Sequence, residues 1–142
     1  MNTAKDILQY KGTDVRSVKP DDTVLHALGV MAEYEIGAVV VLDALELVGI
    51  LTERDYARKV VLLGRSSRDS AIRDVMTEDV ICVSPGTTVD QCLALMTDKR
   101  VRHLPVIEAD QLIGLVSIGD LVRARIAEQE QVIEQLQHYI AG

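Results

Sequence analysis

Two short stretches of the sequence carry the same polar residues at the same spacing. "GILTERD" (49–55) and "GLVSIGD" (114–120) each begin with glycine after an apolar run and end in Thr-x-x-Asp or Ser-x-x-Asp. A hydroxyl followed three residues later by an acidic side chain is typical of a capped helix start. The same pair can hold a ligand, because a carboxylate accepts hydrogen bonds from ribose hydroxyls and a helix start offers N–H groups to phosphate. Both interpretations stand at this point.

The two stretches belong to an internal repeat. With an offset of 65, residues 20–55 align with residues 85–120 without a gap, and ten aligned positions are identical, including Pro20/Pro85 and Asp55/Asp120. Upstream, "AKDIL" matches "IRDVM" with an offset of 68, so the first copy carries three extra residues in the loop "YKGTDVR". A repeat of this length indicates two copies of one supersecondary unit.

Each copy predicts the same series of elements. A short helix leads to a short strand, and a helix follows with apolar residues at positions 24, 28 and 31, or 89, 93 and 96. Two aliphatic strands joined by the turns "DALE" or "EADQ" come next, and a second helix closes the copy. We therefore expect an α+β fold of two β-α-β-β-α motifs, related by a pseudo-twofold axis and packed through their sheets, plus a C-terminal helix. The expected boundaries are motif 1 at 3–63, a linker at 64–70, motif 2 at 71–125 and a helical tail at 126–142.

Composition limits the classes of function. The 142 residues carry a net charge of −7, which argues against non-specific binding to nucleic acid. No apolar run approaches the roughly 20 residues that a membrane helix needs, and the N-terminus lacks the apolar stretch of a signal peptide. We expect a cytoplasmic protein that binds neither membrane nor nucleic acid. The two cysteines, Cys82 and Cys92, are expected to fill core space, and no histidine or cysteine spacing indicates a metal site.

The doubled Gly-h-h-Thr/Ser-x-x-Asp motif (h, apolar) inside a doubled fold resembles a tandem pair of CBS motifs, named for cystathionine β-synthase. The resemblance covers about residues 3 to 125, and "RHLPVI" (102–107) and "MTEDVICVSP" (76–85) are similar to the family at other places. It implies a stand-alone regulatory module, without an attached enzyme or channel.

The resemblance also implies adenine-nucleotide binding in two clefts between the copies. One cleft would use Thr52, Asp55, Thr77, Ile81, Arg102 and His103. The other would use Ser117, Asp120, Arg16, Gly37 and Ala38. Arg54 and Arg58, one turn apart on the first closing helix, would give the Asp55 cleft the richer set of cations for phosphate. Against these roles, the two arginines are equally consistent with a solvated helix face. A core histidine is the alternative for His103.

The implied function is a non-catalytic sensor whose ligand is AMP, ADP, ATP, NAD(H) or an S-adenosyl compound, with no catalytic cofactor. The sequence does not choose among these ligands or identify a regulated partner enzyme. The alternative is a structural adaptor that binds a partner protein and uses the clefts weakly or not at all.

A homodimer is also expected, since Val60, Val61, Leu62, Leu121 and Val122 suggest apolar faces on the closing helices. The tail adds Ile126, Ile133, Leu136 and Ile140, close to a heptad seam that Gln129 interrupts. A helix that packs back on its own domain is the alternative for the tail.

Overall fold

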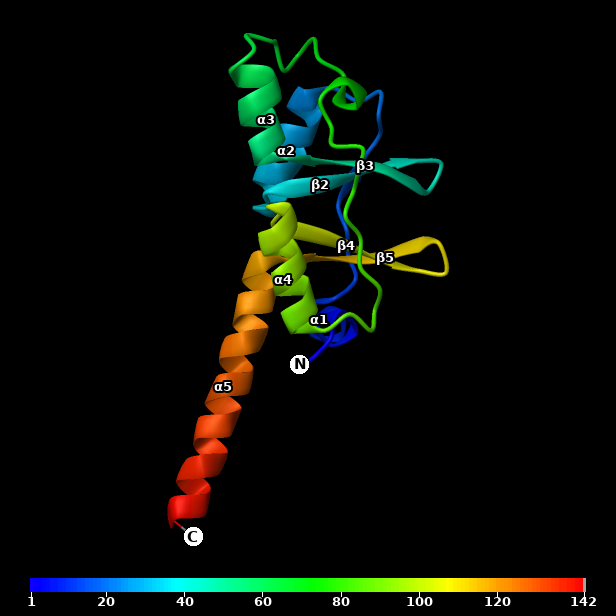
Figure 1. Cartoon of the computed structure of the whole chain (residues 1–142). Coiled ribbons are helices and arrows are strands. Elements are labelled where there is room, and N and C mark those ends of the chain that lie inside the picture. The colour runs from blue at the N-terminus through cyan, green and yellow to red at the C-terminus, as the bar shows by residue number, and fades with distance from the viewer. Residues whose placement is uncertain (142) are drawn as a thin grey trace. The chain divides into compact units, whose positions relative to one another are not determined.

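The computed structural model describes residues 1–141, so only Gly142 of the expected tail lies outside the described residues. The described chain mixes helices with two small sheets and ends in a helix, which confirms the predicted α+β class (Figure 1). It divides into two compact units. The first-copy unit is residues 14–81, and the second-copy unit joins residues 1–13 to the chain from Cys82 onward.

The first-copy unit is built on a three-stranded sheet. Strand β1 (Ser17–Val18) runs parallel to β2 (Ala38–Asp43), and β2 pairs antiparallel with β3 (Glu46–Thr52). Helix α2 (Val24–Tyr34) begins where the Thr23 hydroxyl accepts a hydrogen bond from the His26 N–H. An N-cap of this kind satisfies one of the N–H groups that a helix start leaves unpaired.

The chain leaves β3 directly into a closing helix. Helix α3 (Glu53–Tyr56) continues as a π-helical turn, η1 (Ala57–Val61), and a 3-10 turn, η2 (Ile72–Asp74), comes after the linker. The core of this unit is aliphatic, as the composition predicts. Its buried members are Val18, Val24, Ala27, Met31, Val39, Val41, Leu51, Val60, Ile72 and Val75.

The second-copy unit repeats this arrangement with one sheet of two strands. It contains α1 (Ala4–Lys11), α4 (Val89–Lys99), β4 (His103–Glu108), β5 (Gln111–Ser117) and α5 (Ile118–Ala141). Strands β4 and β5 form an antiparallel pair. The copies therefore differ at the closing helix, because α5 runs far beyond the length of its counterpart.

Both hairpins turn in the same way. The central residues Ala44 and Leu45, and likewise Ala109 and Asp110, all have positive φ angles between 48° and 74°. Two consecutive positive φ values define the type I′ turn, whose twist matches that of an antiparallel strand pair. The turns predicted at "DALE" and "EADQ" are confirmed.

The first segment of each copy folds with the body of the other copy. In the second-copy unit, the N–H groups of Ala4 and Lys5 donate to the carbonyl oxygens of Thr87 and Pro85, both at 2.9 Å. The first-copy unit has the matching pair of bonds, from the N–H groups of Ile72 and Arg73 to the carbonyl oxygens of Asp22 and Pro20. The repeats in the sequence and the compact units in space therefore do not share their boundaries.

Two local predictions need correction. The short strand expected after the first helix of copy two forms only an isolated bridge between Val83 and Val106. Cys92 is buried as predicted, but Cys82 is exposed, because in this extended stretch its neighbour Val83 is the residue that turns inward. Backbone alternation thus excludes Cys82 from the core.

The motif glycines make room for the exchanged segments. A Cβ atom built on Gly49 would lie 2.5 Å from the Met76 sulfur and 3.1 Å from the Thr77 carbonyl oxygen. On Gly114 it would lie 2.5 Å from a methyl carbon of Leu8. In the structure, each admits a side chain of the segment packed on its strand.

We therefore expect Gly49→Ala to destabilise the protein by about 1–3 kcal/mol, because the Thr77 carbonyl is held in place by the backbone and the added methyl overpacks the site. Gly29→Ala is the matched control. Gly29 lies on the exposed side of α2 with nothing within 4 Å, and alanine there should stabilise by about 1 kcal/mol. Chemical denaturation of both variants measures the difference, and equal effects would contradict the packing role.

Candidate functional site

In the first-copy unit the motif forms a buried polar cluster at the junction of β3 and α3, here called the Asp55 cluster (Thr52, Asp55, Lys59 and Thr77). Asp55 is only 8% exposed. One carboxylate oxygen, Oδ2, accepts hydrogen bonds from the Thr52 N–H at 3.0 Å and hydroxyl at 3.1 Å. The other, Oδ1, accepts from the Thr77 hydroxyl at 3.0 Å and lies 3.2 Å from the Lys59 ammonium.

The second-copy unit has the equivalent Asp120 cluster (Lys11, Ser117, Asp120 and Arg123) at the junction of β5 and α5. Asp120 is also 8% exposed, and its Oδ2 accepts a hydrogen bond from the Ser117 N–H at 2.8 Å. Here the remaining partners are both cations. The Lys11 ammonium donates to Oδ2 at 2.8 Å, and the Arg123 guanidinium donates to Oδ1 at 2.7 Å.

The two aspartates have different partners because the segments exchanged between the copies carry different side chains. Thr77 reaches Asp55 from the segment exchanged into the first-copy unit, where its backbone also pairs with Ile50. Lys11 reaches Asp120 from the end of α1, the segment exchanged into the second-copy unit, and is also bonded to the Leu115 carbonyl at 2.9 Å. The same structural exchange thus brings a neutral hydroxyl to one carboxylate and a positive charge to the other.

The electrostatics of the Asp120 cluster follow from these contacts. Burial by itself would raise the pKa of Asp120, but the hydrogen bonds from Lys11 and the Ser117 backbone outweigh it and hold that pKa below its ordinary value. Burial and then the Lys11 charge lower the pKa of His103, and Asp120 offsets part of this effect. A carboxylate and a neutral imidazole are therefore favoured side by side at neutral pH.

The structure shows which unit holds each predicted residue, and the grouping into clefts between the copies stays a prediction. His103 stands directly opposite Ser117 in the β4–β5 ladder, and the Arg102 carbonyl accepts from the Ile118 N–H. Both residues therefore belong to the unit of Asp120, and their grouping with Asp55 in a cleft between the copies stays a prediction.

The reverse holds for the residues that had been grouped with Asp120. Ala38 pairs with Thr52, and the Gly37 carbonyl accepts from the Glu53 N–H at 3.0 Å. Arg16 lies in the same unit, with its guanidinium 3.7 Å above the Tyr34 ring. Each hydroxyl–Asp pair thus has the start of its own copy's hairpin beside it.

The remaining predicted residues lie in the first-copy unit. Thr77 contacts Asp55, as the grouping expected. Arg54 and Arg58 are exposed on the closing helix, and Ile81 is half-buried at the end of the unit. The sequence reasoning missed Lys11 and Lys59. Lys59 follows Asp55 by four residues on one helical stretch, a spacing that signals an ion pair. Lys11 gave no signal, because it lies in the loop with three extra residues and is 109 residues from Asp120.

Other polar features do not join these clusters. A hollow of about 900 Å³ in the first-copy unit is lined by residues of β1, α2 and the β2–β3 turn, and its Arg73 is paired with Asp21.

Within residues 1–141, no group of three or more histidine, cysteine or acidic side chains is arranged to hold a metal ion. No helix in that range combines the length and apolar character needed to cross a membrane.

Comparisons with known proteins agree on one family. The CBS domain matches residues 3–62 and again residues 72–127. "CBS domain-containing protein CBSX3, mitochondrial" of Arabidopsis thaliana is 42% identical over 99% of this chain and 72% of its own length. A solved "putative signal-transduction protein with CBS domains" from Burkholderia ambifaria is 48% identical, with a TM-score of 0.87 over 89% of this chain and 96% of that one.

A third structure is similar in fold alone. It is the CBS domain pair of protein MJ0100 in complex with 5-methylthioadenosine and S-adenosyl-L-methionine. It is 23% identical, with a TM-score of 0.76 over 86% of this chain and 98% of that one.

The His103 environment gives a test of the Asp120 cluster. We expect NMR titration to place the His103 pKa below 6.5 and Lys11→Gln to raise it, because that change removes a neighbouring positive charge. Since the unfolded chain then binds the proton more readily than the folded one, His103 should lower stability as pH falls below about 6.5. Lys5→Gln, an exposed change on the same helix, is the control. An unchanged His103 pKa in Lys11→Gln would contradict this geometry.

Proposed function

The chain belongs to the CBS-domain family, and from this premise we propose that it is a non-catalytic regulatory module that binds adenine nucleotides at its two motif carboxylates. The observation that carries the proposal is the repeated buried aspartate, held at the same junction of strand and helix in both units. The MJ0100 complex supports adenosine-type ligands for this fold. The class of ligand is expected to be a ribose-containing adenine compound.

Helix capping alone does not account for the partners of the two carboxylates. In each cluster a single oxygen, Oδ2, closes the capping box with the backbone N–H of Thr52 or Ser117. The second oxygen, Oδ1, is bonded to side chains only: Thr77 and Lys59 in one cluster, Arg123 in the other. Ribose hydroxyls can replace such side-chain partners without opening the cap.

The two clusters should differ in what they prefer. A ribose that binds Asp120 displaces a cation from it, and a displaced ammonium or guanidinium needs a new negative partner. A phosphate on the same ligand supplies that partner through charge-assisted hydrogen bonds. A ribose at Asp55 can instead displace the neutral Thr77 hydroxyl. We therefore assign the more highly phosphorylated ligand to the Asp120 cluster, the reverse of the preference expected from the sequence.

The proposal extends to location and assembly. We expect the protein to act in the cytoplasm, to associate as a homodimer and to regulate a partner enzyme. Part of the surface first assigned to the dimer is not available, because Val60 and Leu121 are buried in their own units. Val61, Leu62 and Val122 remain exposed and can contribute.

The direct test is ligand binding without turnover. Nucleotide released by heating the purified protein, identified by mass spectrometry, should be an adenine compound, and calorimetry should show binding of AMP, ATP, NADH or S-adenosylmethionine. No response to any of them at millimolar concentration would favour a structural adaptor instead.

The two carboxylates should fail independently. Asp55→Ala or Asp120→Ala removes a cap worth up to about 1 kcal/mol of stability. If the carboxylate also holds ribose hydroxyls, each lost charge-assisted hydrogen bond costs about 1.5–3 kcal/mol, a tenfold to hundredfold weaker affinity in that unit alone. Gln91→Ala is the matched control, because Gln91 closes the α4 capping box at the same helix position. Calorimetric titration that shows stability losses alone, as in Gln91→Ala, would reduce the motif to a helix start.

Lys11 tests the assignment of the phosphorylated ligand. With Asp55→Ala as background, Lys11→Gln should weaken ATP binding by about tenfold or more, because one charge-assisted bond to phosphate is lost, while adenosine binding holds or improves. The difference should shrink as salt is added. With Asp120→Ala as background, Lys59→Gln is the counterpart and should discriminate less between ATP and adenosine. A larger ATP-specific loss with Lys59→Gln would contradict the assignment.

A further inference from the structure

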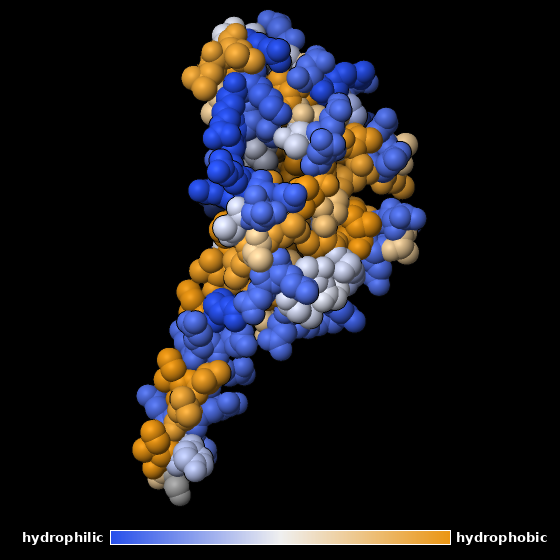
Figure 2. Space-filling model, viewed as in Figure 1, coloured by the Kyte–Doolittle hydropathy of each residue, from blue (hydrophilic) through white to orange (hydrophobic). Residues whose placement is uncertain are grey.

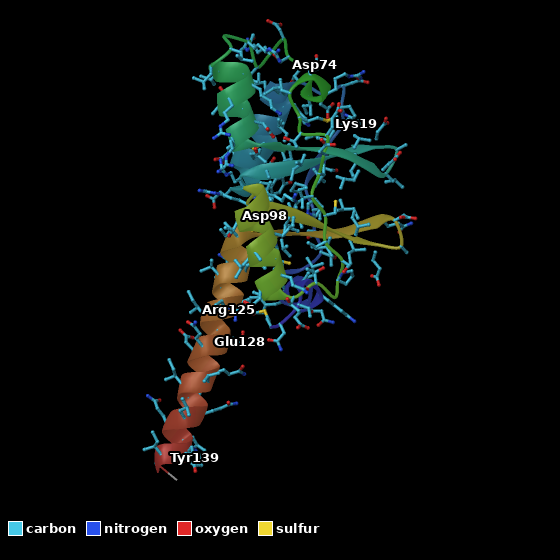
Figure 3. All side chains as sticks on the ribbon, viewed as in Figure 1. Lys19, Asp74, Asp98, Arg125, Glu128 and Tyr139 are labelled. Atoms are coloured by element: carbon cyan, nitrogen blue, oxygen red, sulfur yellow. The ribbon has the colours of Figure 1, made fainter. Side chains whose placement is uncertain are left out.

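The second half of α5 projects from its unit with no packing partner. From Gln129 to Ala141 every residue is exposed, whichever side of the helix it occupies. Figure 1 shows this stretch running away from the sheet, and Figure 3 places Tyr139 near its end, well beyond Arg125 and Glu128. Most helical stability in proteins comes from tertiary packing, and this stretch has none within its own unit. The CBS match ends at residue 127, before the exposed stretch begins.

A regular apolar stripe begins in the first half of α5 and continues through the exposed stretch. In a heptad frame with Ile126 at position a, all later a positions are also isoleucine, and the d positions are Val122, Gln129 and Leu136. Its exposed apolar members are Val122, Ile126, Ile133, Leu136 and Ile140, and Val132 and Tyr139 flank them at g positions. Figure 2 shows apolar surface continuing along this helix to its end. A stripe at a and d positions is the seam of a coiled coil, and β-branched residues at a favour two helices when the coiled coil is parallel.

We propose that α5 pairs with α5 of a second protein chain, identical to this one, as a parallel, in-register coiled coil of two helices over residues 122–140. The polar residue in the seam selects this arrangement. In a parallel pair, d residues face d residues, so Gln129 meets Gln129 of the second protein chain and the two amides hydrogen-bond. In an antiparallel pair, d residues face a residues, and a at 126, 133 and 140 is always isoleucine. The buried amide would then lack a partner, at a cost of about 1–3 kcal/mol.

Flanking charges favour the same arrangement. A parallel pair places a g residue beside the e residue five positions later on the other helix, which brings Arg125 next to Glu130 of the second protein chain. The antiparallel alignment centred near residue 131 instead places Glu130 beside Glu130 of the second protein chain, which brings two like charges together. Arg125 already contacts Asp90 and Glu128, but a guanidinium has five N–H donors and can add a further acceptor.

The first turns of α5 make the pairing more favourable than its short length suggests. Leu121 and Ala124 are buried in the second-copy unit and fix the helix axis before any partner arrives. Only the exposed half must then be ordered on association, which reduces the entropy lost in pairing. The inference does not use the nucleotide site and is tested without ligand.

Disulfide trapping in the full chain tests the pairing. The background is Cys82→Ser, which removes the exposed native thiol and leaves the buried Cys92. Gln129→Cys places a thiol at a d position, where parallel in-register strands bring the two Cα atoms within disulfide range. Mild oxidation should link two chains. Gln131→Cys is the matched control: it replaces the same residue type two positions away, at position f on the opposite side of the helix, and should not link above background.

A second substitution separates helix pairing from random collision. Ile133→Glu, added to Gln129→Cys, places two like charges in one seam layer and should abolish the link. Gln131→Glu, added instead, introduces the same charge outside the seam and should preserve it. Equal linking by Gln129→Cys and Gln131→Cys, or a link that survives Ile133→Glu, would overturn the proposal. So would efficient linking of Ile126→Cys to Leu136→Cys in mixed chains, the mark of antiparallel strands.

Discussion

A set of three backbone hydrogen bonds, made once in each unit, underlies both candidate sites. The N–H groups of Ala4 and Lys5, with that of Val89 donating to Asn2, tie the first segment of copy one to the body of copy two. The N–H groups of Ile72, Arg73 and Val24 make the same three bonds in the other unit. Buried backbone groups must be paired, so the constraint is satisfied only when each segment occupies its place.

The exchange of segments accounts for two features of the motif. It explains the glycine, because Met76 or Leu8 fills the space where a side chain would stand on Gly49 or Gly114. It also explains the chemical difference between the clusters, because the segment that covers each strand brings Thr77 to one carboxylate and Lys11 to the other. The duplicated motif is symmetric in the backbone, and the asymmetry comes from side chains on the exchanged segments and on the closing helices.

How much could be predicted from the sequence depends on how local the determinant is. The repeat was accessible from its gapless alignment at an offset of 65, and the aliphatic core from the composition. The turns and the hydroxyl–Asp pairs were accessible because each rests on spacing within about ten residues. The exchange was not, because it depends on backbone bonds between segments some 50 to 85 residues apart. The grouping of Arg102 and His103 with Asp55 in one cleft rests on the family resemblance and stays a prediction. Hairpin register sets the pairing of His103 with Ser117. The residues of the "RHLPVI" strand alone do not indicate which unit the strand belongs to.

The two carboxylates also show why a helix cap and a ligand grip need not be alternatives. Taking a carboxylate out of water is costly unless it is fully hydrogen-bonded, and a cap alone satisfies only one of its oxygens. In both clusters polar side chains satisfy the rest: the Thr77 hydroxyl, the ammonium groups of Lys59 and Lys11, and the Arg123 guanidinium. Such partners can move aside while the cap keeps the carboxylate in place. The cap therefore fixes the position of the acceptor, and the mobile partners leave its remaining hydrogen-bonding capacity open to a ligand.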